Sequence, residues 1–560
     1  MTAIIADHII SPLADGTAAN LDAVLAGRSA IRRYADHFPL VEPFCASLFS
    51  PAEIKLQAGF SRFESLCINA VHSSAGGLDA GLLSAKDTVF ILSTTKGNIE
   101  FLAQTEDIAL CDSAKRIARF FGNSNTPIVV SNACISGVCA IITAKRLLDE
   151  GIYTNAVIVG CDVLSPFIIS GFQSFKALSD EPCKPYDATR KGLNLGEAAA
   201  CLVLSSDSRW ASRSLGTVMA GSIHNDANHI SGPSRTGEGS YLCLKDVITD
   251  PDTLAFVNVH GTATLYNDEM ESIALNRAGL QNVPVNALKG YFGHTLGAAG
   301  LLETILSLHA LHRGIILGTR GFDQAGTTMP VSVSSATRRT DKKEFVKLLS
   351  GFGGSNAAIR VSIEPTATSE QIPMPDACRI SGEVHITSTA VTVNGQPVAT
   401  KAQGGALLSE LYRTYSGDYP KFFKMDTLAR LGFVASELLL SGIGEERFVP
   451  RTDRAIVMAN RSSCLQNDRA YQKTIMPDNY YPSPALFVYT LPNIVTGEIA
   501  IRNKFFGESS FYVLDNEEQM KPLVSSAFMQ RGVQSVLAGW VECADENTFE
   551  AHICLIEKND

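Results

Sequence analysis

The chain has 560 residues, too many for a single hydrophobic core, so two or three domains are expected. Apolar residues make up 45% of it and charged residues 19%, a balance typical of a well-buried α/β protein. The formal net charge of −10 argues against general binding to nucleic acid.

The thirteen cysteines are scattered, with no CxxC pair and no Cys/His cluster at metal-ligand spacing. This pattern predicts free thiols in a reducing compartment and no metal site. The first residues carry no basic stretch and soon reach Asp7, so no signal peptide is expected. The longest apolar helix candidate, 301–317, contains Glu303 and Arg313 and is therefore core, not a membrane span. We expect a cytoplasmic protein.

Apolar strands alternate with helical stretches twice along the first 364 residues. This alternation predicts layered α/β sheets. The expected strands are 88–92, 128–130, 156–159 and 200–204, and then 256–259, 345–349 and 357–361.

Cys134 follows the strand 128–130 and precedes a helix predicted over 137–148. The free backbone N–H groups and the dipole at this helix end favour a thiolate, which is the nucleophilic form of cysteine. Small neighbours leave room for a thioester. The alternative is that Cys134 is a small core residue.

A second polar stretch follows the strand 256–259. It places His260, Thr262 and Thr264 at a strand end, where α/β proteins build sites. On the next predicted helix, 267–277, Glu271 faces inward and would need a partner. The alternatives are a core histidine and a solvated helix face.

Two glycine-rich stretches complete the candidates. Lys289 and His294 flank a loop that leads into Gly and Ala residues at a helix start, a pattern that packing alone explains poorly. Phe352 lies among glycines 351, 353 and 354 between two strands. The N–H groups of this turn can face an oxyanion, and Phe352 could gate an acyl tunnel, although an ordinary hairpin turn is the alternative.

The remainder of the chain begins with a Pro/Ser/Thr-rich stretch, which predicts a linker over 365–377. The segment 378–560 weakly repeats the first part, because 455–459 resembles 88–93 and 535–541 resembles 156–162 in the same order. The repeat has no cysteine where Cys134 would fall.

The order of these motifs resembles that of the β-ketoacyl-acyl-carrier-protein synthases, the elongating ketosynthases of the thiolase superfamily. The motifs are the Cys134 turn, His260-Gly-Thr-x-Thr264, Lys289-x4-His294 and the Gly-Phe-Gly-Gly loop. The resemblance runs from residue 1 to about 364. It implies a thiolase-like five-layer α-β-α-β-α fold, with halves 1–205 and 206–364. The segment 378–560 resembles a degenerate first half and implies a second, smaller half-thiolase-like α/β domain without a nucleophile.

The resemblance also implies a reaction in two steps. Cys134 accepts an acyl chain from acyl-carrier protein, and malonyl-carrier protein then loses carbon dioxide and attacks the acyl-Cys134. No diffusible cofactor or metal is implied, because decarboxylation supplies the carbanion. The phosphopantetheine arm of acyl-carrier protein counts as part of the substrate. The expected partners are acyl-carrier protein and a second subunit, as a homodimer or as a pseudo-heterodimer through the C-terminal domain.

The resemblance assigns a role to each candidate residue. His260 and His294 would stabilise the enolate, while Lys289 and Glu271 would hold the histidines in orientation. Thr262 and Thr264 would contact the phosphopantetheine arm. The backbone N–H groups of Cys134 and Phe352 would form the oxyanion hole. Phe352 and Gly353 are also expected to bind substrate.

Other activities remain open at this point. One is a degradative thiolase acting on coenzyme A, although no second cysteine suited to act as its base is found. Another is a chain-length partner or scaffold that binds carrier protein without condensing. The pathway could be fatty-acid-like, polyene or polyketide.

Overall fold

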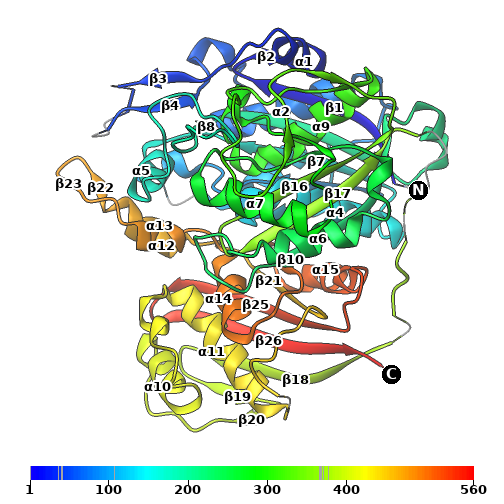
Figure 1. Cartoon of the computed structure of the whole chain (residues 1–560). Helices are drawn as coiled ribbons and strands as arrows, with labels where there is room; N and C mark the ends of the chain where they lie inside the picture. Colours follow the sequence, from blue (N-terminus) through cyan, green and yellow to red (C-terminus); the bar gives the residue numbers. More distant parts are fainter. Residues whose placement is uncertain are drawn as a thin grey trace.

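A computed structural model of the chain describes all but a few residues. The described residues are 2–35, 37–38, 42–105, 108–364, 369, 371–375, 377–444 and 446–559. Figure 1 shows the first 364 residues as one body and the segment from 378 onward (yellow to red) packed beneath it.

The first sheet contains the four predicted apolar strands of residues 1–205 and one further strand, β1, that was not predicted. Its strands pair in the order β6-β5-β7-β9-β1, with β6 and β7 parallel to β5 and with β9 antiparallel to β7 and β1. The strands are β1 (Ala3–Ser11), β5 (Thr88–Ser93), β6 (Ile128–Val130), β7 (Asn155–Asp162) and β9 (Ala198–Ser205).

The second sheet repeats this arrangement in the order β12-β11-β16-β17-β10. Its first pairs are parallel and its last two are antiparallel, and β14 extends the edge beyond β12. The strands are β10 (Gly216–Asn225), β11 (Leu254–Asn258), β12 (Pro284–Asn286), β14 (Ser332–Val333), β16 (Glu344–Gly351) and β17 (Ser355–Ser362).

Helices lie on both faces of each sheet, because the strands are apolar on both sides. The α4 and α9 helices lie between the two sheets, α2 and α3 cover the outer face of the first, and α6 and α7 cover the second. This gives the predicted five layers. The helices are α1 (Thr17–Leu25), α2 (Arg62–Ser74), α3 (Leu110–Phe120), α4 (Ser136–Asp149), α5 (Pro166–Ser174), α6 (Glu238–Val247), α7 (Leu265–Arg277), α8 (Lys289–Phe292) and α9 (Ala299–His312).

The C-terminal segment, residues 378–559, adds a third sheet in the order β24-β21-β25-β26-β18. The α11 and α14 helices cover one face and α15 lies on the other. The elements are β18 (Cys378–Thr387), β21 (Arg454–Asn460), β24 (Ser509–Val513), β25 (Ser535–Asp545), β26 (Thr548–Lys558), α10 (Gly405–Tyr415), α11 (Thr427–Gly442), α12 (Leu465–Gln472), α13 (Pro484–Val488), α14 (Ile494–Asn503) and α15 (Met520–Ala527).

The shorter elements lie at sheet edges and in excursions. An Asn-Gly hairpin is among them: Asn394 and Gly395 have φ angles of 50° and 73° between β19 and β20. These strands are β2 (Ala14–Asp15), β3 (Arg32–Tyr34), β4 (Phe44–Ser47), β8 (Leu195–Gly196), β13 (Ile315–Ile316), β15 (Arg338–Arg339), β19 (Val391–Val393), β20 (Gln396–Pro397), β22 (Ile475–Met476) and β23 (Asn479–Tyr480).

The three sheets share one pattern of strand pairing. In each, the edge strand shifts register at the same place: between Ile4 and Ala6, between Val218 and Ala220, and between Ile380 and Gly382. The strand β24 takes the place of β6, and the two pair antiparallel, Tyr512 opposite Val130. Antiparallel pairing of equivalent strands is the geometry of a twofold interface, here within one chain.

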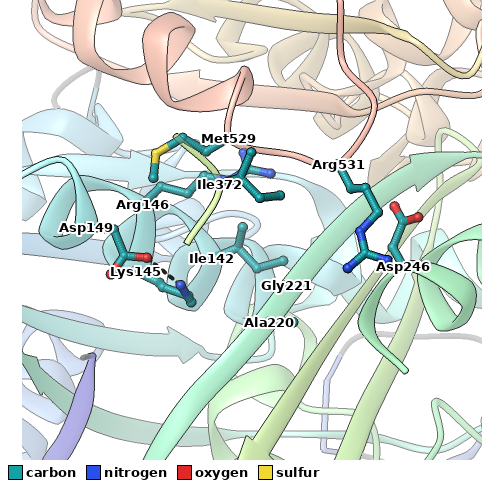
Figure 2. Close-up of a pocket in the computed structure, with 10 residues that line it drawn as sticks. All are labelled: Ile142, Lys145, Arg146, Asp149, Ala220, Gly221, Asp246, Ile372, Met529 and Arg531. Carbon is teal, nitrogen blue, oxygen red and sulfur yellow. Dashed lines mark hydrogen bonds and ion pairs between the residues drawn. The ribbon is translucent and has the colours of Figure 1, made fainter. Parts of the chain in front are cut away.

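Residues 371–375 run along one side of the molecule, between the first part and the C-terminal segment (Figure 1). Residues 365–368, 370 and 376 of the expected linker lie outside the described residues. Ile372 sits in a small pocket of about 40 Å³ (Figure 2). Two cations of this pocket are paired, Lys145 with Asp149 and Arg146 with Glu508, so the pocket does not resemble an anion site. No helix among the described ranges has the length and apolarity that a bilayer crossing requires.

Candidate active site

Cys134 lies at the turn between β6 and α4, as predicted. Its 3-10 turn, η4 (Ala133–Ile135), begins with Ala133 at a φ of 47°, which is a sharp and strained backbone turn for a residue with a side chain. A Cβ on Gly137 would lie 2.9 Å from the Cα of Gly300, so α4 packs directly against the start of α9. This close approach brings the loop before α9 next to Cys134.

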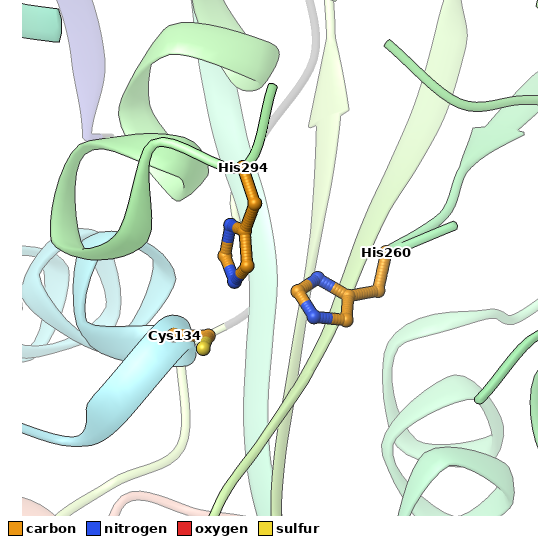
Figure 3. A group of neighbouring side chains, drawn as sticks. All are labelled: Cys134, His260 and His294. Carbon is orange, nitrogen blue, oxygen red and sulfur yellow. The ribbon is translucent and has the colours of Figure 1, made fainter. Parts of the chain in front are cut away.

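The two predicted histidines converge on Cys134 from the second half. The thiol Sγ and one ring nitrogen each of His260 and His294 all lie within 4.8 Å of one another (Figure 3). The two rings are 4.9 Å apart between centroids and inclined by 84°. Cys134 thus meets two histidines that lie 126 and 160 positions further along the sequence.

Hydrogen bonds fix how the histidine at 294 presents its ring. The backbone N–H of Leu296 donates to Nδ1 of His294 over 3.3 Å, so the proton of the neutral ring resides on Nε2. That Nε2 and Nδ1 of His260 are buried and have no hydrogen-bond partner among the described residues. Both atoms are therefore available to a substrate.

Burial sets the charge state of all three groups. It lowers the pKa of His260 and of His294 well below the ordinary value, with the positive charge of Lys289 adding to the effect, so both rings are neutral. Burial also raises the pKa of the Cys134 thiol to about 12. The expected resting thiolate is therefore wrong: the loss of hydration outweighs the helix end and Lys289, and the resting form is the thiol.

Glu271 anchors the turn that carries His260. Its carboxylate accepts hydrogen bonds from the backbone N–H groups of His260 (2.7 Å) and Gly261 (2.8 Å) and from the hydroxyl of Tyr186 (3.2 Å). Burial raises the pKa of Glu271 to about 7. The carboxylate holds the backbone of this turn and makes no recorded bond to either imidazole ring.

Lys289 is fully buried, and its partner is not one of the histidines. Its Nζ donates to Glu303 on α9 over 2.9 Å, and Lys347 on β16 donates to the other oxygen of the same carboxylate. Lys289 and Lys347 lower the pKa of Glu303 against the opposing effect of burial. The sequence reasoning assigned no role to Glu303 or Lys347. The sequence signal that could have found them is a charged residue within an apolar segment: Glu303 within an apolar helix and Lys347 within an apolar strand.

Asp162, at the end of β7, is a further residue without a predicted role. Its carboxylate accepts from the hydroxyls of Thr94 (2.8 Å) and Thr95 (3.0 Å) and from the backbone N–H of Gly297 (2.7 Å). The loop of His294 is thereby tied to the end of β5. A single acid at the end of a strand carried too little signal to be found.

A cavity of about 520 Å³ opens at the three groups and holds most of the predicted substrate-binding residues. Thr262 and Thr264 line it and share a hydrogen bond of 2.9 Å. Phe352 also lines it, and a Cβ on neighbouring Gly351 would lie 3.3 Å from the backbone nitrogen of Cys134. Gly353 has a φ of 90° and lies behind this wall.

The C-terminal segment contacts the wall of this cavity. The side-chain amide of Asn493 donates to the carbonyl oxygen of Phe352 over 2.7 Å, and a Cβ on Gly497 would meet the backbone of Gly353. The ring of Phe487 lies against Phe172 and Phe175, both of which line the cavity.

A buried ion pair adds to these contacts. Nζ of Lys96 donates to Asp468 over 2.6 Å and also to the carbonyl oxygen of Thr490. The 94–97 stretch, which Asp162 ties to the His294 loop, is therefore itself bound to the C-terminal segment.

The five-layer fold, with one thiol and two neutral imidazoles at a shared cavity, defines a thiolase-like acyltransferase. Residues 65–209 match the family model of the β-ketoacyl synthase N-terminal domain, and residues 215–323 match that of the C-terminal domain. Residues 65–323 of the chain thus match both domains of the β-ketoacyl synthase family.

Two curated relatives support the assignment. The chain is 27% identical over 400 residues to 3-oxoacyl-[acyl-carrier-protein] synthase 2 of Vibrio cholerae, covering 63% of this chain and 96% of the relative. It is 29% identical over 256 residues to Nodulation protein E of Rhizobium leguminosarum, which covers 44% of this chain and 64% of that relative.

The fold of the whole chain also has solved counterparts. It is similar to a structure described as a PfaC keto synthase-chain length factor, with a TM-score of 0.78 at 14% identity over 100% of this chain and 78% of the other. A ketosynthase of Xenorhabdus doucetiae, solved with its chain length factor, aligns with 65% of this chain at a TM-score of 0.58 and 22% identity.

Proposed function

We propose that the chain catalyses the decarboxylative condensation of an acyl thioester with malonyl-acyl-carrier protein, through an acyl group on Cys134. The supporting observation is the convergence of Cys134 with two neutral imidazoles at one cavity of about 520 Å³. The relatives named 3-oxoacyl-acyl-carrier-protein synthase agree with this reaction.

In the first step the Cys134 sulfur attacks the thioester of an acyl-carrier protein. Because the thiol is protonated at rest, its proton passes to the departing carrier thiolate as the new thioester forms. The oxyanion of the tetrahedral intermediate would be held by the backbone N–H groups of Cys134 and Phe352. The products are acyl-Cys134 and the free carrier thiol.

In the second step malonyl-carrier protein enters along Thr262 and Thr264. Its thioester oxygen would accept a hydrogen bond from Nε2–H of His294, and His260 would donate a second one. These donors stabilise the enolate as carbon dioxide leaves. Neutral imidazoles suit this task, because they donate hydrogen bonds to the enolate oxygen without transferring a proton to the carbanion.

The enolate carbon then attacks the acyl-Cys134 thioester, and a new carbon–carbon bond forms while the carbon–sulfur bond breaks. The leaving thiolate takes one proton from solvent. Acyl-Cys134, malonyl-carrier protein and one proton thus give 3-oxoacyl-carrier protein, carbon dioxide and free Cys134. Decarboxylation supplies the carbanion, so this route calls on no diffusible cofactor.

Intact-mass analysis of the full chain with acyl- and malonyl-carrier protein tests this proposal. An acyl adduct should map to Cys134, and 3-oxoacyl-carrier protein should follow. Cys134→Ser should lose both, whereas Cys139→Ser, a matched change of another buried cysteine on α4, should keep both. Product formed at an unchanged rate by Cys134→Ser would overturn the proposal.

For the C-terminal segment a second role is favoured, that of a chain-length partner without condensing activity. It pairs β24 with β6 as a twofold partner would, and Phe487 and Asn493 contact the cavity wall. The position equivalent to Cys134 follows β24 and carries acidic and amide residues instead. We retain the division into 1–205, 206–364, the linker 365–377 and 378–560 as part of this proposal, within a fatty-acid-like, polyene or polyketide pathway.

A further inference from the structure

The C-terminal sheet exposes a face that is buried in the other two sheets. Because the three sheets share one register, residues can be matched position by position. At one equivalent position, the first sheet has Leu202 on β9 and the second has Ile359 on β17, and both side chains are fully buried. The C-terminal sheet has Cys554 on β26 at this position.

The same replacement recurs along these strands. Ala200 and Ala357 are buried in the first two copies, and the third has His552 at that position. Beside it on the edge strand, Ile9 and Ile223 are matched by His385. The C-terminal sheet therefore has a polar face where the other two sheets have an apolar one. The Glu383 side chain on this face is 48% exposed.

Three side chains of this face are close enough to share one ion. Nε2 of His552 lies 3.4 Å from Sγ of Cys554 and 3.9 Å from a carboxylate oxygen of Glu383. All three donor atoms lie within 4.8 Å of one another. For a tetrahedral zinc ion with bonds of about 2.0 Å to nitrogen and 2.3 Å to sulfur, these two atoms stand about 3.5 Å apart.

A second contact orients the histidine for such a role. Nδ1–H of His552 donates to the carboxylate of Glu517, just before α15, over 2.6 Å. Metal-bound histidines commonly donate their second nitrogen to a carboxylate, which fixes the ring and leaves the other nitrogen free for the ion. With Nδ1–H held by Glu517, Nε2 of His552 faces Cys554 and Glu383.

We propose that Glu383, His552 and Cys554 form a binding site for a zinc ion, with water as the fourth ligand. The mixture of thiolate, imidazole and carboxylate suits zinc better than calcium or magnesium. Binding displaces the thiol proton of Cys554 and the Nε2 proton of His552 to solvent, with no change of oxidation state. The ion joins β18 to β26, and Glu517 extends the contact to the start of α15.

The site could not be predicted from the sequence, because no two of its ligands have the spacing of a zinc-finger motif. His552 and Cys554 are two residues apart and so share one face of a strand, and Glu383 lies directly opposite Cys554 only through the pairing of β18 with β26. The ligand set is therefore a product of strand register.

Equilibrium dialysis of the full chain against zinc chloride tests the proposal. The Cys134→Ser background removes the thiol of the second Cys/His cluster found among the described residues. One zinc per chain is expected, together with a rise in melting temperature on adding zinc. Cobalt chloride should give a thiolate-to-metal charge-transfer band in the near ultraviolet.

Matched variants decide the outcome. Cys554→Ser and His552→Gln should lose the bound zinc and the cobalt band, whereas Cys378→Ser, a change of an exposed cysteine on β18, should keep both. Glu517→Gln should weaken zinc binding about tenfold, as expected of a residue that orients a ligand. No zinc on the parent, or the same zinc content in Cys554→Ser, would overturn the proposal.

Discussion

The side-chain amide of Asn493 donates a hydrogen bond of 2.7 Å to the carbonyl oxygen of Phe352. The two residues are 141 positions apart, and the bond joins the start of α14 to the loop beside Cys134. Through this contact the C-terminal segment bears on the conformation of the candidate oxyanion hole.

Asn493→Leu should therefore slow turnover more than it weakens substrate binding. Loss of the donor frees the Phe352 loop, and misplacement of a catalytic group by about 1 Å can cost about 10²-fold in rate. We expect kcat to fall between about tenfold and 10²-fold with little change in KM. Thr496→Val is the control, because the Thr496 hydroxyl on α14 donates to the Asn493 carbonyl and not to the Phe352 loop. Equal losses in both variants would contradict the prediction.

Phe487→Ala should widen the acyl cavity. The Phe487 ring packs on Phe172 and Phe175, so its removal opens the wall and should shift products toward longer acyl chains, measured by mass spectrometry. The new cavity should also destabilise the fold by about 3–5 kcal/mol. Phe528→Ala, a buried change beside α15, should cost stability without changing product length. An unchanged product distribution in Phe487→Ala would count against a pocket-shaping role.

His260→Ala and His294→Ala should each slow the decarboxylation of malonyl-carrier protein by about 10²–10³-fold, the usual cost of one oxyanion donor. Acylation of Cys134 should persist, because its oxyanion is held by backbone N–H groups. The release of labelled carbon dioxide and the mass of the acyl-enzyme measure the two steps separately. His309→Ala is the control. His309 lies near the end of α9 and pairs with Asp7 on β1. Retained decarboxylation in either variant would refute the assignment.

Alkylation of Cys134 should become faster with pH over the whole range from neutral to strongly alkaline. With a pKa of about 12, the thiolate fraction rises about tenfold for each pH unit below that value. Timed iodoacetamide labelling with peptide mass spectrometry measures the rate at Cys134, with the exposed Cys378 as internal reference. A rate that levels off near neutral pH would show that the helix end, not burial, controls this thiol.

Glu303→Gln should strongly destabilise the protein. It leaves the buried Lys289 and Lys347 without their shared carboxylate, and removal of one partner from a buried ion pair costs about 3–5 kcal/mol. Chemical denaturation of the variant measures this loss. Asp22→Asn, which breaks the exposed pair with Arg313, should cost at most about 1 kcal/mol.

The sequence by itself determined where the strands 88–92, 128–130, 156–159 and 200–204 lie along the chain, the turn at Cys134 and the weak repeat in 455–541. These are local features, since an apolar run, a glycine or a small residue constrains its own neighbourhood. The motif residues His260 and His294 were found because each sits in a polar stretch directly after or before a regular element.

Only the tertiary structure decided which groups face one another. The Glu303 carboxylate between Lys289 and Lys347 depends on the packing of a helix against a strand, and the contact of Asn493 with Phe352 depends on how distant segments dock. The protonation of Cys134 follows from burial, which no local pattern reports. Long-range contacts and desolvation are properties of the folded chain, and a sequence pattern carries neither.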